Sequence, residues 1–187
     1  AEIARIQAAK PDAVYAFMPG GPGINLVKQY VQAGLKDTIP LLSAFTVDDT
    51  SLPALGETAD GFVSASQWAV DLDNPANRRF VAAFRAKHGY VPSYYASQAY
   101  DAAPLIDAAV RQTGGSLEKA KLRDALRTAT FPSVRGTWKL NTNHFPINDF
   151  RLVRAGKLDD GTLAMRSGEL VFEGYADDFA KDCKMTW

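Results

Sequence analysis

The turn Pro19-Gly20-Gly21-Pro22-Gly23 is the clearest candidate for a ligand-binding segment in the sequence, because it separates an apolar run from an amphipathic segment. Residues 13–18 predict a short buried strand, and residues 24–33 predict a helix that Gly34 ends. In open α/β sheets, ligands bind where strands end and helix N-termini offer N–H groups, and glycine allows close approach. The turn matches neither a dinucleotide fingerprint nor a phosphate loop. A bare strand-to-helix turn therefore explains the glycines about as well as a ligand site does.

The side chains that could catalyse a reaction are dispersed. Of the two histidines, His88 precedes Gly89 at a predicted helix end, where a cation favours the helix dipole. His144 lies in a predicted turn with no second ligand at metal spacing. A Gly-x-Ser-x-Gly elbow is absent. Paired carboxylates are interpreted as solvated caps at Asp48-Asp49, Asp159-Asp160 and Asp177-Asp178. We therefore expect that the protein is not an enzyme and binds no cofactor and no metal. Turnover of a test ester or of NAD would instead support the interpretation as a hydrolase or a dehydrogenase.

The composition excludes several classes of protein. The 187 residues are 47% hydrophobic and 22% charged, which is typical of a globular protein. Lys plus Arg and Asp plus Glu each number 21, so the chain has no basic excess for nucleic acid. No apolar run approaches the roughly 20 residues that cross a bilayer. The single cysteine, Cys183, leaves both its role and the redox compartment open.

The first 65 residues predict the elements that position the glycine-rich turn. Strands are expected over residues 13–18, 39–45 and 61–65, with a helix over 24–33 and a short helical piece before the last strand. This alternation is typical of an α/β layer with a parallel sheet. The chain begins inside a helical pattern without the regions of a signal peptide. We expect that either a short leader or a large N-terminal part is missing.

The remaining residues predict helices and then β-structure. Pro75 near a first turn and Gly89 support a helix over residues 74–88. A second helix is expected to begin at Ala99, after an irregular segment where Tyr94 and Tyr95 can line a cleft. Tyr100 is predicted to be core. The other expectations are a helix over 117–129 with Ser116 as its N-cap, and β-segments at 136–140, 150–154 and 170–172.

Five strings resemble the leucine/isoleucine/valine-binding family of type I periplasmic receptors. They are AAKPDAVYAFMPGGPGINLVKQYVQAGL, IPLLSAF, ETADGFVSAS, PSYYASQAYDAAPLIDAAVRQTGG and FPSVRGTWKLNTNHFPINDFRLVR. Their order and spacing together are fairly specific, and the resemblance covers essentially the whole chain. It implies the type I periplasmic-binding-protein fold, an α/β fold with a parallel sheet flanked by helices. Receptors of this family have two α/β lobes joined by three crossovers. The lobes hold a ligand between them and close by hinge bending.

The resemblance also implies an incomplete two-lobe arrangement. Residues 1–90 would be a second-lobe segment, 91–139 would return to the first lobe, and the β-rich residues 140–187 would return to the second. Most of the first lobe would then be absent from this chain. Either a second polypeptide supplies that lobe or the chain is truncated.

The family's ligand residues of the second lobe can be carried over by position. Amino-acid binders have an acidic residue near Phe45, where it pairs with the ligand ammonium. A buried ammonium without a carboxylate would be costly, so Phe45 argues against an α-amino acid. If the alignment has slipped, Phe45 is merely core. The residues implied to contact the ligand are Met18, Pro19, Gly20, Phe45, Thr46 and Tyr95.

The function implied is the periplasmic solute-binding component of an ABC importer, which delivers its ligand to a membrane permease. The favoured ligand is a small organic acid, in particular an aromatic carboxylate. Two alternatives stay open: binding of branched-chain amino acids, and a ligand-sensing regulatory domain of the same fold.

Overall fold

The computed structural model describes residues 1–185, and these form two compact units. Unit 1 comprises Ala1–Val70 and Arg151–Glu169, and unit 2 comprises Asp71–Phe150 and the residues from Leu170 onward. The predicted segment boundaries at residues 90 and 139 stay a prediction.

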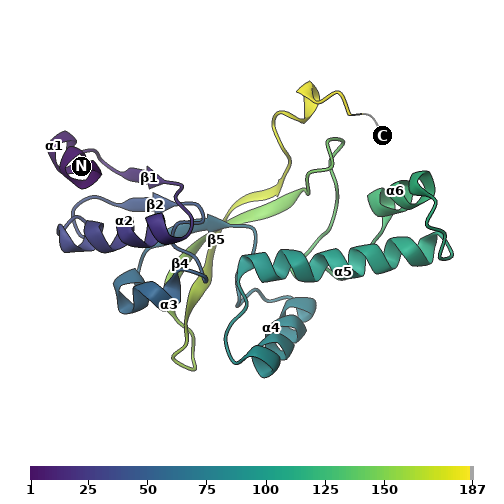
Figure 1. Ribbon diagram of the computed structural model, residues 1–187, viewed down its shortest axis with the longest axis horizontal. Coiled ribbons are helices and arrows are strands. Elements are labelled where there is room, and N and C mark those ends of the chain that lie inside the picture. Colours follow the sequence, from purple (N-terminus) through teal and green to yellow (C-terminus); the bar gives the residue numbers. More distant parts are fainter. Residues whose placement is uncertain (186–187) are drawn as a thin grey trace. The chain divides into compact units, whose positions relative to one another are not determined.

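Unit 1 is built on strands that alternate with helices, as the sequence predicts (Figure 1). Its elements are α1 (Glu2–Ala9), β1 (Val14–Ala16), α2 (Gly21–Gln32), β2 (Leu41–Ser43), α3 (Leu52–Leu55), the 3-10 helix η1 (Gly56–Ala59) and β3 (Val63–Ser66). The strands β4 (Asn148–Lys157) and β5 (Leu163–Tyr175) pass through both units. Together the strands form one five-stranded sheet in the order β1-β2-β3-β4-β5.

The sheet is mixed. β1, β2 and β3 pair in parallel, whereas β3 pairs with β4 in antiparallel orientation. The register aligns Ala16 with Ser43, Ser43 with Ser64, and Ser64 with Val153. The predicted α/β class is confirmed, and β4 is the point at which the sheet departs from the parallel expectation. Because β1 to β3 run in parallel, their carboxyl ends meet at one edge.

The two faces of this sheet differ in exposure. Residues two apart on a strand share a face, and Leu41 and Val153 are buried on one of them. On the other face, Tyr15 is 70% exposed, Leu42 42% and Leu152 39%. On β1 to β4 the buried hydrophobic side chains therefore gather on one face of the sheet, whereas on β5 the adjacent residues Ala164 and Met165 are both buried.

Helix α2 contributes Val27 and Tyr30 to the core of unit 1, and both side chains are fully buried. The Tyr30 hydroxyl donates a hydrogen bond of 2.8 Å to the carbonyl oxygen of Ile39, just before β2. Burial raises the pKa of Tyr30 above its ordinary value. The helix begins earlier than predicted, at Gly21, because a proline at its second position needs no N–H partner. Gly34, with φ 69°, ends it as expected.

Unit 2 contains three longer helices, α4 (Pro75–His88), α5 (Tyr94–Gln112) and α6 (Lys119–Thr128), and the 3-10 helix η2 (Ala180–Asp182). The side chain of Asn74 caps α4 by accepting a hydrogen bond of 2.8 Å from the Ala76 N–H. Helices α5 and α6 pack against each other through small buried side chains, Ala109, Ala125 and Ala129. None of the helices within residues 1–185 combines the length and apolar character that crossing a bilayer requires.

Several predictions for unit 2 were wrong. Helix α5 begins at Tyr94 and not at Ala99, because Ser93 caps it by accepting a hydrogen bond of 3.3 Å from the Ala96 N–H. Tyr94 and Tyr95 therefore lie on a helix instead of an irregular segment. Tyr100 is 45% exposed rather than core, although its ring packs against Phe80 of α4 with the ring centroids 4.5 Å apart.

The later boundaries also differ from the predicted ones. Helix α6 begins at Lys119, and Ser116 does not cap it; the Ser116 hydroxyl accepts from the Glu118 N–H at 3.4 Å instead. Residues 136–140 form no strand and take part only in isolated bridges. The strand β5, with 13 residues, is much longer than the predicted segment 170–172, and it is hydrogen-bonded to β4 in the sheet.

Candidate functional site

The candidate site lies at the carboxyl-end edge of β1, β2 and β3 in unit 1. This is the edge at which open α/β sheets bind ligands. The turn at residues 17–20 follows β1, and Phe45 and Thr46 follow β2. After β3, the Ser66 hydroxyl is occupied locally, because it donates to the Trp68 carbonyl oxygen at 2.8 Å. The structure thus brings five of the six predicted residues to one edge: Met18, Pro19, Gly20, Phe45 and Thr46.

Two glycines shape the turn that leads into α2. Gly20 is the N-cap, with φ 75° and ψ −148°, a conformation that residues with a Cβ rarely adopt. A Cβ on Gly23 would lie 1.9 Å from the Met18 carbonyl oxygen and 3.0 Å from Cγ2 of Thr46. Gly23 therefore allows the turn to pack directly on the first turn of α2. Gly23 is the last residue of the glycine-rich turn recognised in the sequence, but it is not among the six residues predicted to contact a ligand.

Thr46 joins the two loops of the edge. It is fully buried, and its Oγ1 accepts a hydrogen bond of 2.8 Å from the Met18 N–H. The same hydroxyl lies 3.1 Å from the Ala16 carbonyl oxygen, to which it donates. One side chain thus satisfies backbone groups on both sides of Phe17. The predicted contact of Thr46 with a ligand stays a prediction.

Phe45 has an unusual backbone and a ring neighbour. Its φ of 56° lies in the left-handed region, which is an outlier for a bulky residue. The Phe45 and Phe17 ring centroids are 6.2 Å apart at an interplanar angle of 79°, an edge-to-face arrangement. Phe17 is 62% exposed, and Phe45 is partly exposed. We refer to these two side chains as the Phe17–Phe45 ring pair.

The acidic residues nearest in sequence to Phe45 are used for structure. Asp48 Oδ1 accepts hydrogen bonds of 2.9 Å from the N–H groups of Thr50 and Ser51, at the start of α3. Asp48 therefore orders the loop before α3, whose N-cap is Ser51, and it is buried instead of being the solvated cap that was predicted. Asp49 Oδ1 accepts from the Met165 N–H at 2.9 Å. Within the described residues, no group of three or more His, Cys, Asp or Glu side chains could hold a metal ion.

The sixth predicted residue, Tyr95, lies in unit 2 near the start of α5. Its ring is 46% exposed and lies against Tyr94, with the two ring centroids 3.8 Å apart. Its participation in one site with the residues of unit 1 stays a prediction.

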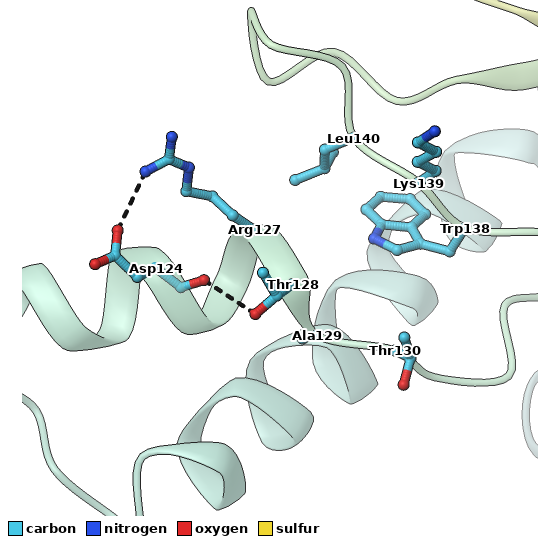
Figure 2. Close-up of a pocket in the computed structure, with 8 residues that line it drawn as sticks. All are labelled: Asp124, Arg127, Thr128, Ala129, Thr130, Trp138, Lys139 and Leu140. Atoms are coloured by element: carbon cyan, nitrogen blue, oxygen red, sulfur yellow. Dashed lines mark hydrogen bonds and ion pairs between the residues drawn. The ribbon is translucent and has the colours of Figure 1, made fainter. Parts of the chain in front are cut away.

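Unit 2 also holds an open groove of about 590 Å³, shown in Figure 2. Trp138, whose ring packs at 5.1 Å from Phe131, forms one wall of it. Arg127 on α6 forms an ion pair of 3.1 Å with Asp124. None of the six predicted residues lines this groove. The lining consists of Asp124, Arg127, Thr128, Ala129, Thr130, Trp138, Lys139 and Leu140.

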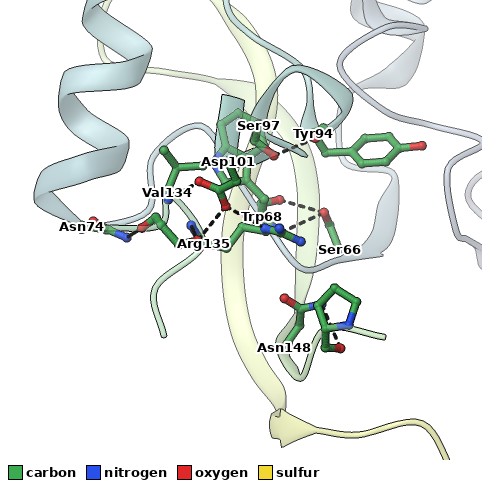
Figure 3. A network of polar contacts seen from close by, with 11 residues as sticks. Ser66, Trp68, Asn74, Tyr94, Ser97, Asp101, Val134, Arg135 and Asn148 are labelled. Atoms are coloured by element: carbon green, nitrogen blue, oxygen red, sulfur yellow. Dashed lines mark hydrogen bonds and ion pairs between the residues drawn. The ribbon is translucent and has the colours of Figure 1, made fainter. Parts of the chain in front are cut away.

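A buried polar cluster around Asp101 stabilises unit 2 (Figure 3). Asp101 on α5 is 1% exposed, and its Oδ2 accepts from the Ser133 hydroxyl at 2.6 Å and from Nε of Arg135 at 3.0 Å. Its Oδ1 accepts from the Val134 N–H at 3.0 Å. Asn74 extends the cluster by donating to the Ser133 carbonyl oxygen at 2.8 Å. This carboxylate is held by structural partners, and we assign it no role in ligand binding.

Comparison with known proteins places these features in a family. A curated relative from Brucella melitensis, Leu/Ile/Val-binding protein homolog 6, is 34% identical over 165 residues, which cover 84% of this chain and 42% of the relative. A solute-binding protein of an ABC transporter from R. palustris, solved in complex with benzoate, is 36% identical with a TM-score of 0.84. The match covers 98% of this chain and 49% of that one.

A second solved structure is a solute-binding protein of an ABC transporter from Rhodopseudomonas palustris HaA2 in complex with p-hydroxybenzoic acid. It is 28% identical with a TM-score of 0.82, over 94% of this chain and 49% of that one. The chain thus spans about half the length of these solved structures, and less than half of the curated relative. The resemblance predicted from the sequence is confirmed. A family model described as periplasmic binding protein matches residues 1–162, and the chain belongs to that family.

Proposed function

We propose that this chain is part of the solute-binding component of an ABC importer and that the ligand is an aromatic carboxylate. The observation that carries the proposal is the Phe17–Phe45 ring pair at the ends of two parallel strands. Flat apolar walls with a few polar groups are typical of small-molecule sites. Relatives of the same fold that bind benzoate and p-hydroxybenzoic acid support this choice of ligand.

The chemistry of the edge favours a ligand without an amino group. Residues 17–20 and 45–46 contain no acidic side chain, and Asp48 Oδ1 already accepts hydrogen bonds from the Thr50 and Ser51 N–H groups. The ammonium of an amino acid, once removed from water, needs a carboxylate or an equivalent set of acceptors. An aromatic acid makes no such demand. Its ring can pack against Phe17 and Phe45, and Met18, which is 37% exposed, adds a deformable apolar contact.

Polar groups would orient the ligand. The first turn of α2 has N–H groups at Gly21 and Gly23, whereas Pro22 has none. Such N–H groups at a helix N-terminus attract anions, so an acid or a phenolate substituent is preferred there. The Tyr95 hydroxyl is proposed as a further polar contact, supplied when the receptor closes.

The proposal includes a partner and a location. Family membership supports a periplasmic protein that passes its ligand to a membrane permease, with the remaining first-lobe residues supplied by the same protein. The 34% identity to a Leu/Ile/Val-binding homologue favours branched-chain amino acids as the second candidate ligand. The absence of an acidic residue at positions 45 and 46 argues against it.

The experiment is a calorimetric titration of the protein, at its full natural length, with benzoate, 4-hydroxybenzoate and leucine. We expect saturable binding of at least one aromatic acid. Phe45→Glu should weaken it by at least about tenfold, because it puts a negative charge beside the ring and the bound anion. Phe145→Glu is the matched control, since Phe145 is 62% exposed in unit 2 and outside the site. Binding of leucine but of neither acid, or unchanged binding by Phe45→Glu, would overturn the proposal.

A further inference from the structure

The polar contacts of Thr46 give it a role that its burial alone does not suggest. Its hydroxyl accepts from the Met18 N–H at 2.8 Å and lies 3.1 Å from the Ala16 carbonyl oxygen. These contacts join residues 28 and 30 positions apart in the chain. With no exposed surface, Thr46 is screened from competing water, so these hydrogen bonds hold their geometry.

The backbone of Met18 is also held at its carbonyl group. Its carbonyl oxygen lies so close to Gly23 that a Cβ there would meet it at 1.9 Å. The N–H is therefore fixed by Thr46, and the C=O of Met18 is confined by the first turn of α2. The backbone between Ala16 and Met18 has little freedom left, and this backbone sets the direction of the Phe17 side chain.

The second ring is held by the same residue. Phe45 precedes Thr46 and has φ 56°, a conformation that persists for a bulky residue only where the surroundings determine it. The anchored Thr46 hydroxyl fixes the chain directly after Phe45, and the Ala44 N–H fixes the chain before it by donating to the Ala16 carbonyl oxygen at 3.2 Å. The result is the edge-to-face ring pair with its centroids 6.2 Å apart.

Resting on the proposed binding of aromatic acids, we infer that Thr46 is a positioning residue: its buried hydroxyl sets the Phe17–Phe45 ring pair without touching the ligand. This inference gives the predicted site residue a different mode of action. Removing the hydroxyl should loosen the relative placement of the rings while leaving both of them present. Affinity for a flat ring should then fall, because a preformed wall binds better than one that must be ordered.

The test compares Thr46→Val, which keeps the shape and loses the hydroxyl, with Thr46→Ser, which keeps the hydroxyl. Titration with benzoate should show about a tenfold loss of affinity for Thr46→Val, because the two rings must then be ordered when the ligand binds. Thr46→Ser should stay within about threefold of the unsubstituted protein. The second readout is amide hydrogen exchange without ligand, which should accelerate at Met18 in Thr46→Val alone.

The outcomes separate the two proposals. Loss of affinity with accelerated exchange confined to Met18 and its neighbours supports the positioning role. Accelerated exchange throughout α2, including Val27 and Tyr30, would show a general loss of stability and overturn it. So would equal benzoate affinity in Thr46→Val and Thr46→Ser. If the unsubstituted protein binds no aromatic acid, the proposed function is wrong. Independently of ligand binding, unchanged amide exchange at Met18 in Thr46→Val would show that the Thr46 hydroxyl does not position the backbone.

Discussion

The edge of the sheet in unit 1 and the polar cluster around Asp101 in unit 2 differ in how far their side chains are exposed and in how far their polar groups are satisfied within the chain. At the edge, aromatic rings are exposed, Phe45 has a left-handed backbone, and glycine is required at positions 20 and 23. Around Asp101, a buried carboxylate has three hydrogen-bond donors, one of which is the guanidinium of Arg135, whose side chain is only 7% exposed. The first region leaves groups available to a ligand. The second satisfies its groups within the chain.

The difference between the two regions indicates where a ligand would bind. Backbone strain and exposed rings lower stability unless something outside the chain compensates, so they point to a binding role. A satisfied buried network has no capacity left for a ligand, and its effect is to fix local structure. The two regions should therefore respond differently to substitution, and three experiments test this difference.

The largest effect is expected for Asp101→Ala. It leaves the Arg135 guanidinium buried without its carboxylate, which typically costs about 3–5 kcal/mol of unfolding free energy. Denaturant unfolding and amide exchange of α5 measure the loss. Asp107→Ala is the control on the same helix, because its ion pair with Arg111 is exposed to solvent and should contribute little to stability. Similar losses in the two variants would contradict the assignment of the cluster as structural.

The next effect concerns the turn before α2. Gly23→Ala forces the Met18 carbonyl oxygen away, and overpacking of this kind costs about 1–3 kcal/mol. Gly21→Ala, with no atom within 4 Å of the added Cβ, should be neutral or slightly stabilising, because alanine favours helix. Thermal unfolding of both variants checks the difference. A harmless Gly23→Ala would mean that the turn is not confined as described.

The smallest effect separates strain from ring contact at Phe45. Phe45→Gly removes both, whereas Phe45→Ala removes the ring but keeps a Cβ in the left-handed region. The glycine variant should therefore be more stable than the alanine variant by about 1 kcal/mol. Both should bind benzoate poorly. Equal stabilities, measured by denaturant unfolding, would show that the backbone of Phe45 is not strained.

Much of the fold was predictable because its signals are local. The apolar run before Pro19 and the glycine at position 34 predicted β1 and the end of α2. The start of α5 was missed because the bulky side chains of Tyr94 and Tyr95 hid the capping signal of Ser93. The length of β5 could not be read from its own residues, since it depends on pairing with β4.

The candidate site was predictable only as a set of positions. Resemblance to a family identified Phe45 and Thr46, and strand order brought them to the same edge as Met18. The sequence could not distinguish a side chain that faces a ligand from one that holds the backbone. That distinction depends on the hydrogen bond from Met18 to Thr46, which spans 28 positions and appears only after the strands pair.

The left-handed backbone of Phe45 also has a consequence for selection. If only folding stability were selected, substitutions to glycine or asparagine at position 45 would accumulate, because these residues tolerate a positive φ. A screen for heat-resistant variants should recover such substitutions, and each would reduce the aromatic surface at the sheet edge. At position 45, selection for greater thermal stability would therefore act against selection for ligand recognition.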